Sequence, residues 1–404
     1  MNWSIVALFA TTIVAAEIAA ADITALRVGP VPATVRQAYH LAPFYQKHID
    51  AGGLPIVSSS KVADCALLEA AWLINQMLDG RNEIRRAIIR SDVKVRVAIM
   101  ATTEFTTDLP EHSDLKPKPF WDKRARGLGA TAERPAVSCG EENLLCYPGD
   151  PYVTENILIH EFGHVIHEVG MKGVDPQFDS HLEATYLKAM KDGLWSGKYA
   201  SQNRMEYWAE GVQSWFDTNR VNDHDHNEVH TRAQLKEYDP GLSKLLAEVF
   251  GDKPWRYVEP AKRADLGHLK NCNLTKLPTF RWPAELIAWN KSHPDGAAAE
   301  ADGVLLPLLA AGQTPPPASP RSDRKTLLYF INHTQTEVLV YWNDWSGKLK
   351  PSARLRAGES VEENTFVGHV FVITDLTDKP LAVVVADEKP GRAVIEPAAT
   401  PKQP

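Results

Sequence analysis

The most informative stretch of the sequence is Ile157-Leu-Ile-His160-Glu161-Phe162-Gly163-His164-Val-Ile166, which places the pattern H-E-x-x-H inside an apolar helix. Four residues span about 400 degrees of helix, so His160 and His164 leave one face a turn apart and can chelate one Zn²⁺. Glu161 is offset by one position and can reach the open coordination position as a general base. The pattern favours a catalytic zinc site over a chance pentapeptide in an amphipathic helix.

A catalytic zinc site needs a third protein ligand. The metzincin pattern would place Gly at 167 and His at 170, whereas the chain has His167 and Gly170. His167 lies too far along the helix axis to share a metal with His160, so we expect it to pack or to support the site. Downstream, a predicted helix carries Glu206 and Glu210 one turn apart. One of these carboxylates can bind zinc while the other accepts the N–H of a ligating histidine; the alternative is a solvated acidic face.

Two segments together resemble the protease domain of anthrax lethal factor and its relatives, which are gluzincins: His160-Glu-Phe-Gly-His164 and Tyr199-Ala-Ser-Gln-Asn203-Arg-Met-Glu206-Tyr-Trp-Ala-Glu210. The matched stretch runs from about 155 to 216. The resemblance implies that Glu206 is the third zinc ligand and that Tyr199 stabilises the oxyanion. It further implies one Zn²⁺ per chain, peptide-bond hydrolysis with Glu161 as general base, and a protein or peptide substrate.

Other polar and glycine-rich segments receive simpler interpretations. Residues 223–230, Asp-His-Asp-His-Asn-Glu-Val-His, could hold a second metal, but a polar loop is favoured because the ligand geometry is not fixed. Residues 127–132 imitate a dinucleotide fingerprint but follow a basic loop rather than a strand, so we reject nucleotide binding. Residues 116–126 hold the densest basic patch, which predicts a solvated loop in preference to a binding surface.

Composition excludes some classes of protein. The chain has 404 residues, with 44 Lys and Arg against 51 Asp and Glu and a formal net charge of -7. Because no long basic run occurs, we expect no nucleic-acid partner. At about 100 to 200 residues per domain, the length predicts two or three domains.

The N-terminus predicts export. An apolar stretch from Ile5 to Ala16 is followed by Ala19-Ala20-Ala21, so we expect a signal peptide over 1–21, a secreted or periplasmic protein, and no membrane span after signal removal. In such a compartment disulfides are permitted, and spacing favours the pairs Cys139–Cys146 and Cys65–Cys272 over buried free thiols.

Apolar periodicity predicts the N-terminal elements. Helices are expected over 32–49, 61–79, 154–169, 180–192, 204–217 and 240–250. A strand is expected over 94–100, as a candidate for the sheet edge that aligns substrate, with loops over 102–107 and 110–114. These elements predict a metallopeptidase domain over 22–295.

The C-terminal part has a different composition. Residues 296–324 are rich in Ala, Pro and Ser, which is typical of a linker. Short β-rich segments separated by turns then predict an all-β sandwich over 325–390, followed by a flexible tail over 391–404. The expected strands are 326–332, 338–342, 360–365, 369–374 and 381–386.

The sandwich segments Leu328-Tyr-Phe-Ile-Asn332-His-Thr, Val340-Tyr-Trp342-Asn-Asp-Trp-Ser-Gly347 and Asn364-Thr365-Phe-Val-Gly368-His369-Val-Phe371 are similar to the β domain of the von Hippel-Lindau tumour suppressor. In that family the sandwich recognises a hydroxyproline in an extended peptide. The resemblance implies a peptide-binding site formed by Trp342, Thr365, His369 and Phe371. Here Thr365 replaces a Ser, Phe371 replaces a Trp and Ser352 replaces a Tyr, so the ligand stays open; the alternative is that Trp342 and Phe371 are core aromatics.

The sequence therefore predicts the α+β class: a mainly helical, zincin-like metallopeptidase domain with a small sheet, followed by an all-β sandwich. The predicted function is that of an exported zinc metalloendopeptidase. The alternative is a catalytically inactive zinc-binding protein whose C-terminal domain binds a partner peptide.

Overall fold

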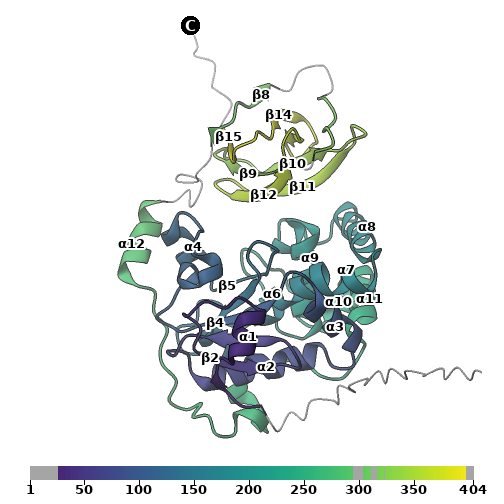
Figure 1. Cartoon of the computed structure of the whole chain (residues 1–404). Coiled ribbons are helices and arrows are strands. Elements are labelled where there is room, and N and C mark those ends of the chain that lie inside the picture. Colours follow the sequence, from purple (N-terminus) through teal and green to yellow (C-terminus); the bar gives the residue numbers. More distant parts are fainter. Residues whose placement is uncertain (1–25, 294–303, 311–315, 323, 397–404) are drawn as a thin grey trace, which may run out of the picture.

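The computed structural model describes residues 26–293, 304–310, 316–322 and 324–396 (Figure 1). Helices and sheets both occur, which is compatible with the predicted α+β class. The predicted signal peptide over 1–21 lies outside the described residues, as do residues 397–404 of the predicted tail.

A six-stranded sheet forms the centre of the N-terminal part, with the order β1-β2-β3-β4-β6-β5. Its strands are β1 (Gly29–Pro30), β2 (Lys47–Asp50), β3 (Pro55–Ser58), β4 (Arg96–Met100), β5 (Gly127–Leu128) and β6 (Ala136–Gly140). Strands β3, β4 and β6 are parallel, and β5 pairs antiparallel with β6. The strand predicted over 94–100 is confirmed as β4, but it lies inside the sheet, paired with β3 on one side and β6 on the other, and all its residues are buried. The expectation that it forms the edge was wrong; β5 is the edge on that side.

Helices surround this sheet. Their bounds are α1 (Ala33–Ala38), α2 (Asp64–Met77), α3 (Asn82–Arg90), α4 (Lys118–Arg124), α5 (Glu141–Leu144), α6 (Ile157–Val165), α7 (Lys172–Val174), α8 (Phe178–Lys191), α9 (Arg204–Trp215), α10 (Arg232–Tyr238), α11 (Pro240–Phe250) and α12 (Ala284–Ser292). Five of the six expected helices are confirmed in α2, α6, α8, α9 and α11. The helix expected over 32–49 ends at Ala38, because His40 takes a left-handed φ of 50° and the following segment joins the sheet as β2. The loop expected over 116–126 is largely helix α4.

One large hydrophobic core joins the sheet to its helices. Leu67 and Ile74 of α2, Val97 of β4, Phe162 of α6 and Trp208 of α9 are all at most 1% exposed and belong to the same cluster. Burial of this apolar area is the main favourable term in folding. It fixes α6 between the sheet and α9.

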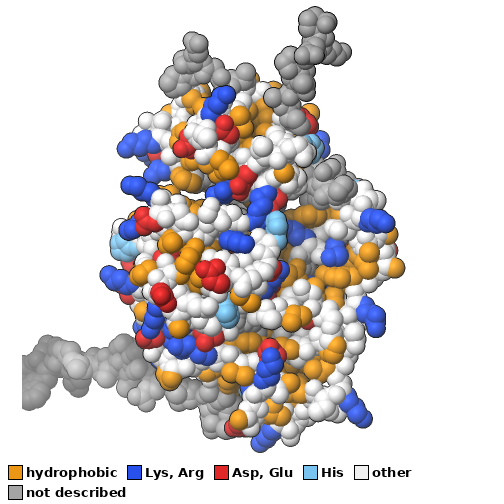
Figure 2. All heavy atoms as spheres, turned by 180° about the vertical axis from the view of Figure 1, so that it is seen from behind, with side chains coloured by type: hydrophobic (Ala, Val, Ile, Leu, Met, Phe, Trp, Pro, Cys, Tyr) orange, Lys and Arg blue, Asp and Glu red, His pale blue; other side chains and the backbone are white. Residues whose placement is uncertain are grey.

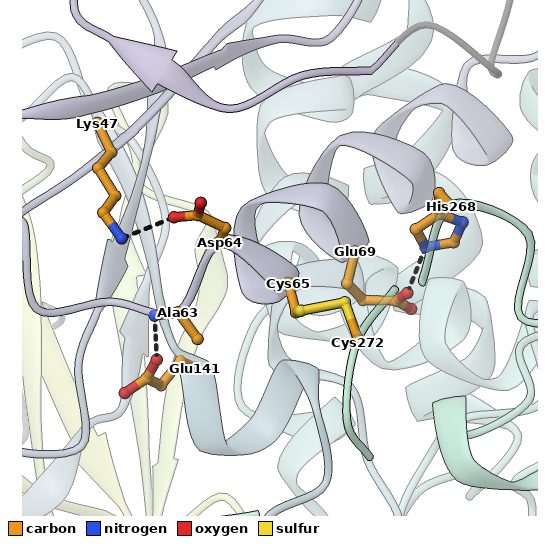
Figure 3. The surroundings of a disulfide bond; sticks show 8 residues. All are labelled: Lys47, Ala63, Asp64, Cys65, Glu69, Glu141, His268 and Cys272. Carbon is orange, nitrogen blue, oxygen red and sulfur yellow. Dashed lines mark hydrogen bonds and ion pairs between the residues drawn. A yellow bond between two sulfur atoms is a disulfide. The ribbon is translucent and has the colours of Figure 1, made fainter. Parts of the chain in front are cut away.

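A disulfide ties the last part of this domain to α2. Cys65 and Cys272 are bonded, which confirms that predicted pair, and they close a loop across 207 residues of sequence. Nearby, the fully buried carboxylate of Glu69 accepts a hydrogen bond of 2.8 Å from His268 Nε2 (Figure 3). The same carboxylate pairs with Arg263. The segment that contains Arg263 and Cys272 is therefore held to α2 by both a covalent bond and a buried ion pair.

The predicted pair Cys139–Cys146 was wrong, because both are free thiols. Cys139 lies in β6 with its side chain in the hydrophobic core. The intervening residues form α5 rather than a closed loop, and the Cys146 Sγ lies 3.7 Å from the Tyr257 hydroxyl.

The C-terminal part contains two further sheets, of order β11-β10-β13-β14-β8 and β12-β9-β15-β7. The strands are β7 (Val304–Leu305), β8 (Leu309–Ala310), β9 (Lys325–Asn332), β10 (Val338–Asn343), β11 (Leu349–Leu355), β12 (Ser360–Phe366), β13 (Val370–Thr374), β14 (Pro380–Val385) and β15 (Gly391–Ile395). All five expected strands are confirmed. The sheets share a core in which the rings of Phe330 and Phe371 are 5.3 Å apart.

The predicted boundaries of this part need correction. Strands β7 and β8 lie in the expected linker, and β15 lies in the expected tail. Strand β8 pairs with β14, β15 pairs with β9, and β7 pairs with β15 at the edge of that sheet. Short runs of this kind carry little periodic signal alone and are defined by their partners.

Two further features are the distribution of charge on the surface and the apolar character of the helices. Figure 2 shows Lys and Arg interspersed with Asp and Glu on the face opposite that of Figure 1. In the described part of the chain, no helix is long and apolar enough to cross a membrane.

Candidate metal centre

Helix α6 carries the H-E-x-x-H residues and begins where the sequence provides a cap. The Asn156 side chain accepts a hydrogen bond of 3.1 Å from the Ile159 amide, which satisfies a free N–H of the first turn. His160 and His164 are each 9% exposed, and their Nε2 atoms lie 3.3 Å apart. Both imidazoles therefore converge on one point from the same face of the helix.

Helix α9 brings Glu206 to that point. It is capped by Asn203, whose side chain accepts from the Glu206 amide at 2.9 Å. Gly163 of α6 faces Val212 of α9, and its carbonyl accepts a hydrogen bond of 2.9 Å from Trp208 Nε1. Glu206 Oε2 consequently lies 3.1 Å from His160 Nε2 and 3.6 Å from His164 Nε2.

These three donor atoms fit a tetrahedral zinc ion. Zinc ligands at about 2.0 to 2.1 Å in tetrahedral geometry are roughly 3.3 Å from one another. The three observed separations, 3.3, 3.1 and 3.6 Å, lie around that value. Glu161 stands beside them, with one of its oxygens within 4.8 Å of a nitrogen of each histidine.

The electrostatics also suit a cation. Burial alone would lower the pKa of His160, but the hydrogen bond to Glu206 and the charges of Glu161, Glu206 and Glu210 outweigh it and raise the pKa. Burial raises the pKa of Glu161. The shift of His160 shows that the carboxylates create a negative potential at the point where the imidazoles meet.

A second layer of side chains orients His160. Its Nδ1 lies 3.0 Å from Gln213 Oε1 and 3.6 Å from Glu210 Oε1. An Nδ1–H donated to this layer leaves the Nε2 lone pair for a metal. The sequence predicted that Glu210 supports a ligating histidine, but the same role of Gln213 was not predicted. Gln213 follows Glu206 by seven residues, which puts both on one helix face.

Helix α9 is also linked to the loop before α10. Glu210 Oε2 lies 3.3 Å from His226 Nε2, and His226 Nδ1 lies 2.8 Å from Asp223 Oδ1. His226 is 6% exposed, so the solvated loop expected over 223–230 is correct for only part of that segment. No second group of His, Cys, Asp or Glu side chains converges on one point within the described ranges.

Tyr199 lies on the other side of His160. Its ring centroid is 6.4 Å from that of His160, and its amide donates to the Asp225 carbonyl at 2.8 Å. The charge of Glu206, together with burial, raises the pKa of Tyr199 well above its usual value. The hydroxyl therefore keeps its proton at neutral pH and can donate a hydrogen bond.

His167 takes no part in this cluster. It is buried and its Nε2 lies 2.9 Å from Asp179 Oδ1, one turn beyond His164 in a π-helical turn (Ile166–Met171) that continues α6. This is the packing and support role expected for it.

A pocket of about 290 Å³ opens onto the centre. Its lining includes His160, Glu161 and Tyr199, and also Gly127 of the edge strand β5. At Gly127 a Cβ would lie 2.2 Å from Ile157 and 3.4 Å from the Glu161 side chain, so only glycine lets this strand approach α6.

No protein-family model and no curated protein matches this sequence.

The arrangement itself can bind a divalent cation and place a carboxylate and a phenol beside it. Two imidazoles and one carboxylate are a common ligand set for catalytic zinc, and they leave a position open. The free carboxylate of Glu161 and the Tyr199 hydroxyl would flank that position.

The residues expected to bind a peptide in the C-terminal sandwich divide into two groups. Thr365 Oγ1 lies 2.9 Å from His369 Nδ1, and the ring centroids of Trp342 and His369 are 5.1 Å apart. Phe371 is 1% exposed and contacts Phe330 in the core. The structure thus brings Trp342, Thr365 and His369 together, but Thr365 and His369 are themselves buried and Trp342 packs against the core. The expectation that Phe371 lines a binding surface was wrong, because Phe371 is a core aromatic.

Proposed function

We propose that this chain is an exported zinc metalloendopeptidase related in its catalytic residues to the lethal factor group of gluzincins. His160, His164 and Glu206 would hold one Zn²⁺. The proposal rests above all on the convergence of His160 Nε2, His164 Nε2 and Glu206 Oε2 within 3.1 to 3.6 Å of one another, beside the unligated carboxylate of Glu161.

Each residue of the centre has a chemical task in this proposal. When bound, Zn²⁺ is a Lewis acid that lowers the pKa of water and polarises a carbonyl. Glu161 takes a proton from the attacking water on a carboxylate oxygen and passes it to the leaving amine. Because burial raises the pKa of Glu161, its proton affinity is closer to what that transfer requires. Tyr199 donates its hydroxyl proton in a hydrogen bond to the developing oxyanion.

The edge strand β5 supports a peptide as substrate. It lies at the end of the sheet, next to α6, and carries backbone groups that no further strand of the described sheet pairs with. An extended peptide can add to such an edge by main-chain hydrogen bonds, which would lay its scissile bond along the pocket. In this proposal the appended sandwich, similar to the von Hippel-Lindau β domain, holds a further segment of the protein substrate.

The test is to replace Glu161 by Gln, with Glu168→Gln as a matched control. Glu168 is an exposed residue of the same helical segment. We expect Glu161→Gln to retain zinc and to lose at least about 10³-fold in kcat/KM on a peptide library read by mass spectrometry, because the general base is gone. The Glu168→Gln protein should cleave like the natural chain.

Two results would count against the proposal. Equal cleavage by the natural chain and Glu161→Gln would remove Glu161 from the mechanism. Zinc binding without cleavage of any peptide would favour the alternative, an inactive zinc protein that works through its sandwich.

A further inference from the structure

Three arginines line the pocket, and two of them are already paired. Arg126 is fully buried, with its Nε 2.6 Å from Glu142 Oε1. Arg220 lies 2.7 Å from Asp223 and 3.5 Å from Glu155. Arg124 forms no ion pair with any carboxylate of the described residues, although it stands on the same pocket wall.

Arg124 is held in place by its backbone. It is the last residue of α4, and its carbonyl accepts a hydrogen bond of 2.6 Å from the Tyr152 hydroxyl. The next carbonyl, that of Ala125, accepts one of 2.6 Å from Thr106 Oγ1. Its guanidinium carbon is 5.6 Å from the centroid of the Trp121 ring, so the side chain leans on an aromatic face. An arginine supported in this way is pre-organised for a ligand.

The guanidinium faces the reacting centre. Arg124 lines the same pocket as Glu161 and Tyr199, close enough for its charge to act on both. The Arg124 side chain is exposed, so its guanidinium can meet a ligand that enters the pocket.

We propose that Arg124 is the specificity-determining residue of this pocket and binds a carboxylate of the peptide substrate beside the scissile bond. The inference rests on the proposed peptidase function. A guanidinium offers two parallel N–H donors that match the two oxygens of a carboxylate. That carboxylate belongs either to an Asp or Glu side chain or to the C-terminus of the peptide, and the two sources differ in what the enzyme would release.

The test starts from one peptide that the natural chain cleaves, identified from a peptide library by mass spectrometry. It is synthesised in matched forms: with a free C-terminal acid or an amide, and with Glu or Gln at each position flanking the cleaved bond. The natural chain should prefer one carboxylate form by about tenfold or more in kcat/KM, the value of a charge-assisted hydrogen bond. Preference for the free acid would assign the C-terminus, and preference for Glu would assign a side chain.

Arg124→Gln should abolish that preference, and Arg124→Lys should restore only part of it because Lys lacks the fork. The control is Lys123→Gln, the same change of charge at the neighbouring residue, whose Nζ lies 4.4 Å from the Trp282 ring centroid and not in the pocket lining. A second readout is binding of the fluorescein-labelled acid and neutral peptides to Glu161→Gln protein with and without Arg124→Gln. The acid form should bind more tightly only where Arg124 is present.

Cleavage without any preference for a carboxylate would overturn this inference and leave the peptidase function standing. So would Arg124→Gln slowing acid and neutral peptides equally, since Arg124 would then act on the transition state. Failure of the natural chain to cleave any peptide would overturn the proposed function and this inference with it.

Discussion

Single side chains at the centre are held from two sides. His160 presents Nε2 to His164 and Glu206, while its Nδ1 faces Gln213 Oε1 at 3.0 Å. Groups fixed in this way need not reorganise when a ligand arrives, which is how a site gains affinity and rate. The Glu210 to His226 contact extends this support beyond α9.

Tyr199 provides a prediction at this scale. Replacing it by Phe removes one hydroxyl and keeps the ring beside His160. We expect zinc content and KM to stay unchanged and kcat to fall by about 10²-fold or more, because a donor to the oxyanion is lost. Steady-state kinetics on a cleaved peptide measure this.

The control is Tyr341→Phe on the sandwich, whose hydroxyl donates to Asp378 at 2.8 Å. It should leave kcat unaltered. An unchanged kcat in Tyr199→Phe would show that the phenol does not act on the oxyanion, and a loss of zinc would assign it a structural part instead.

At the scale of elements, the loop between α9 and α10 is tied to the centre through His226. Burial alone would lower the pKa of His226, but hydrogen bonds to Glu210 and Asp223 outweigh it and raise the pKa to about 9. A folded-state pKa above the unfolded value of about 6.5 stabilises the fold fully below pH 6.5. That stabilisation is lost as the pH rises through 9.

The prediction is that the natural chain loses roughly 3 kcal/mol more unfolding free energy between pH 6.5 and 9.5 than His226→Gln does. Urea unfolding at both pH values measures the difference. His230→Gln in the same loop, where His230 contacts the Glu228 carbonyl at 2.9 Å, is the control and should follow the natural chain. Parallel pH curves for the natural chain and His226→Gln would contradict the account.

Helices with a clear apolar period and a capping residue could be predicted from the sequence alone. Helices α6 and α9 carry apolar periodicity and Asn caps, so His160 and His164 followed from spacing. Spacing left Glu206 and Glu210 open as the third ligand, and only the family resemblance favoured Glu206. Strand β5 has two residues, and its place at the sheet edge depends on pairing with β6, which no local pattern specifies. The place of Arg124 in the pocket lining could not be predicted for the same reason, because the basic segment is exposed and only the tertiary fold sets α4 beside the centre.

At the scale of the whole molecule, distant segments meet in ways that spacing cannot determine. The long-range disulfide Cys65–Cys272 was predictable only as what remained after pairing Cys139 with Cys146, and that first pairing was wrong. The predicted boundaries of the sandwich were also wrong, because β7, β8 and β15 are short strands that are defined by the strands with which they pair.

The sandwich also contacts the loop that positions Tyr199. Arg356 Nη1 lies 3.2 Å from Asp225 Oδ1 and 2.9 Å from His224 Nδ1, and the Asp225 carbonyl accepts the Tyr199 amide. A residue more than a hundred positions away thus supports the wall of the pocket. This contact joins the two parts of the chain at the wall of the pocket.

Metal content of the purified chain decides whether His160, His164 and Glu206 hold a zinc ion. Elemental analysis should find about one zinc per chain in the natural protein and in Glu237→Ala, an exposed glutamate of α10, and little or none in Glu206→Ala. That result would establish the ligand set His160, His164 and Glu206. Absence of zinc from the natural chain after metal has been supplied, or an equal content in Glu206→Ala, would contradict it.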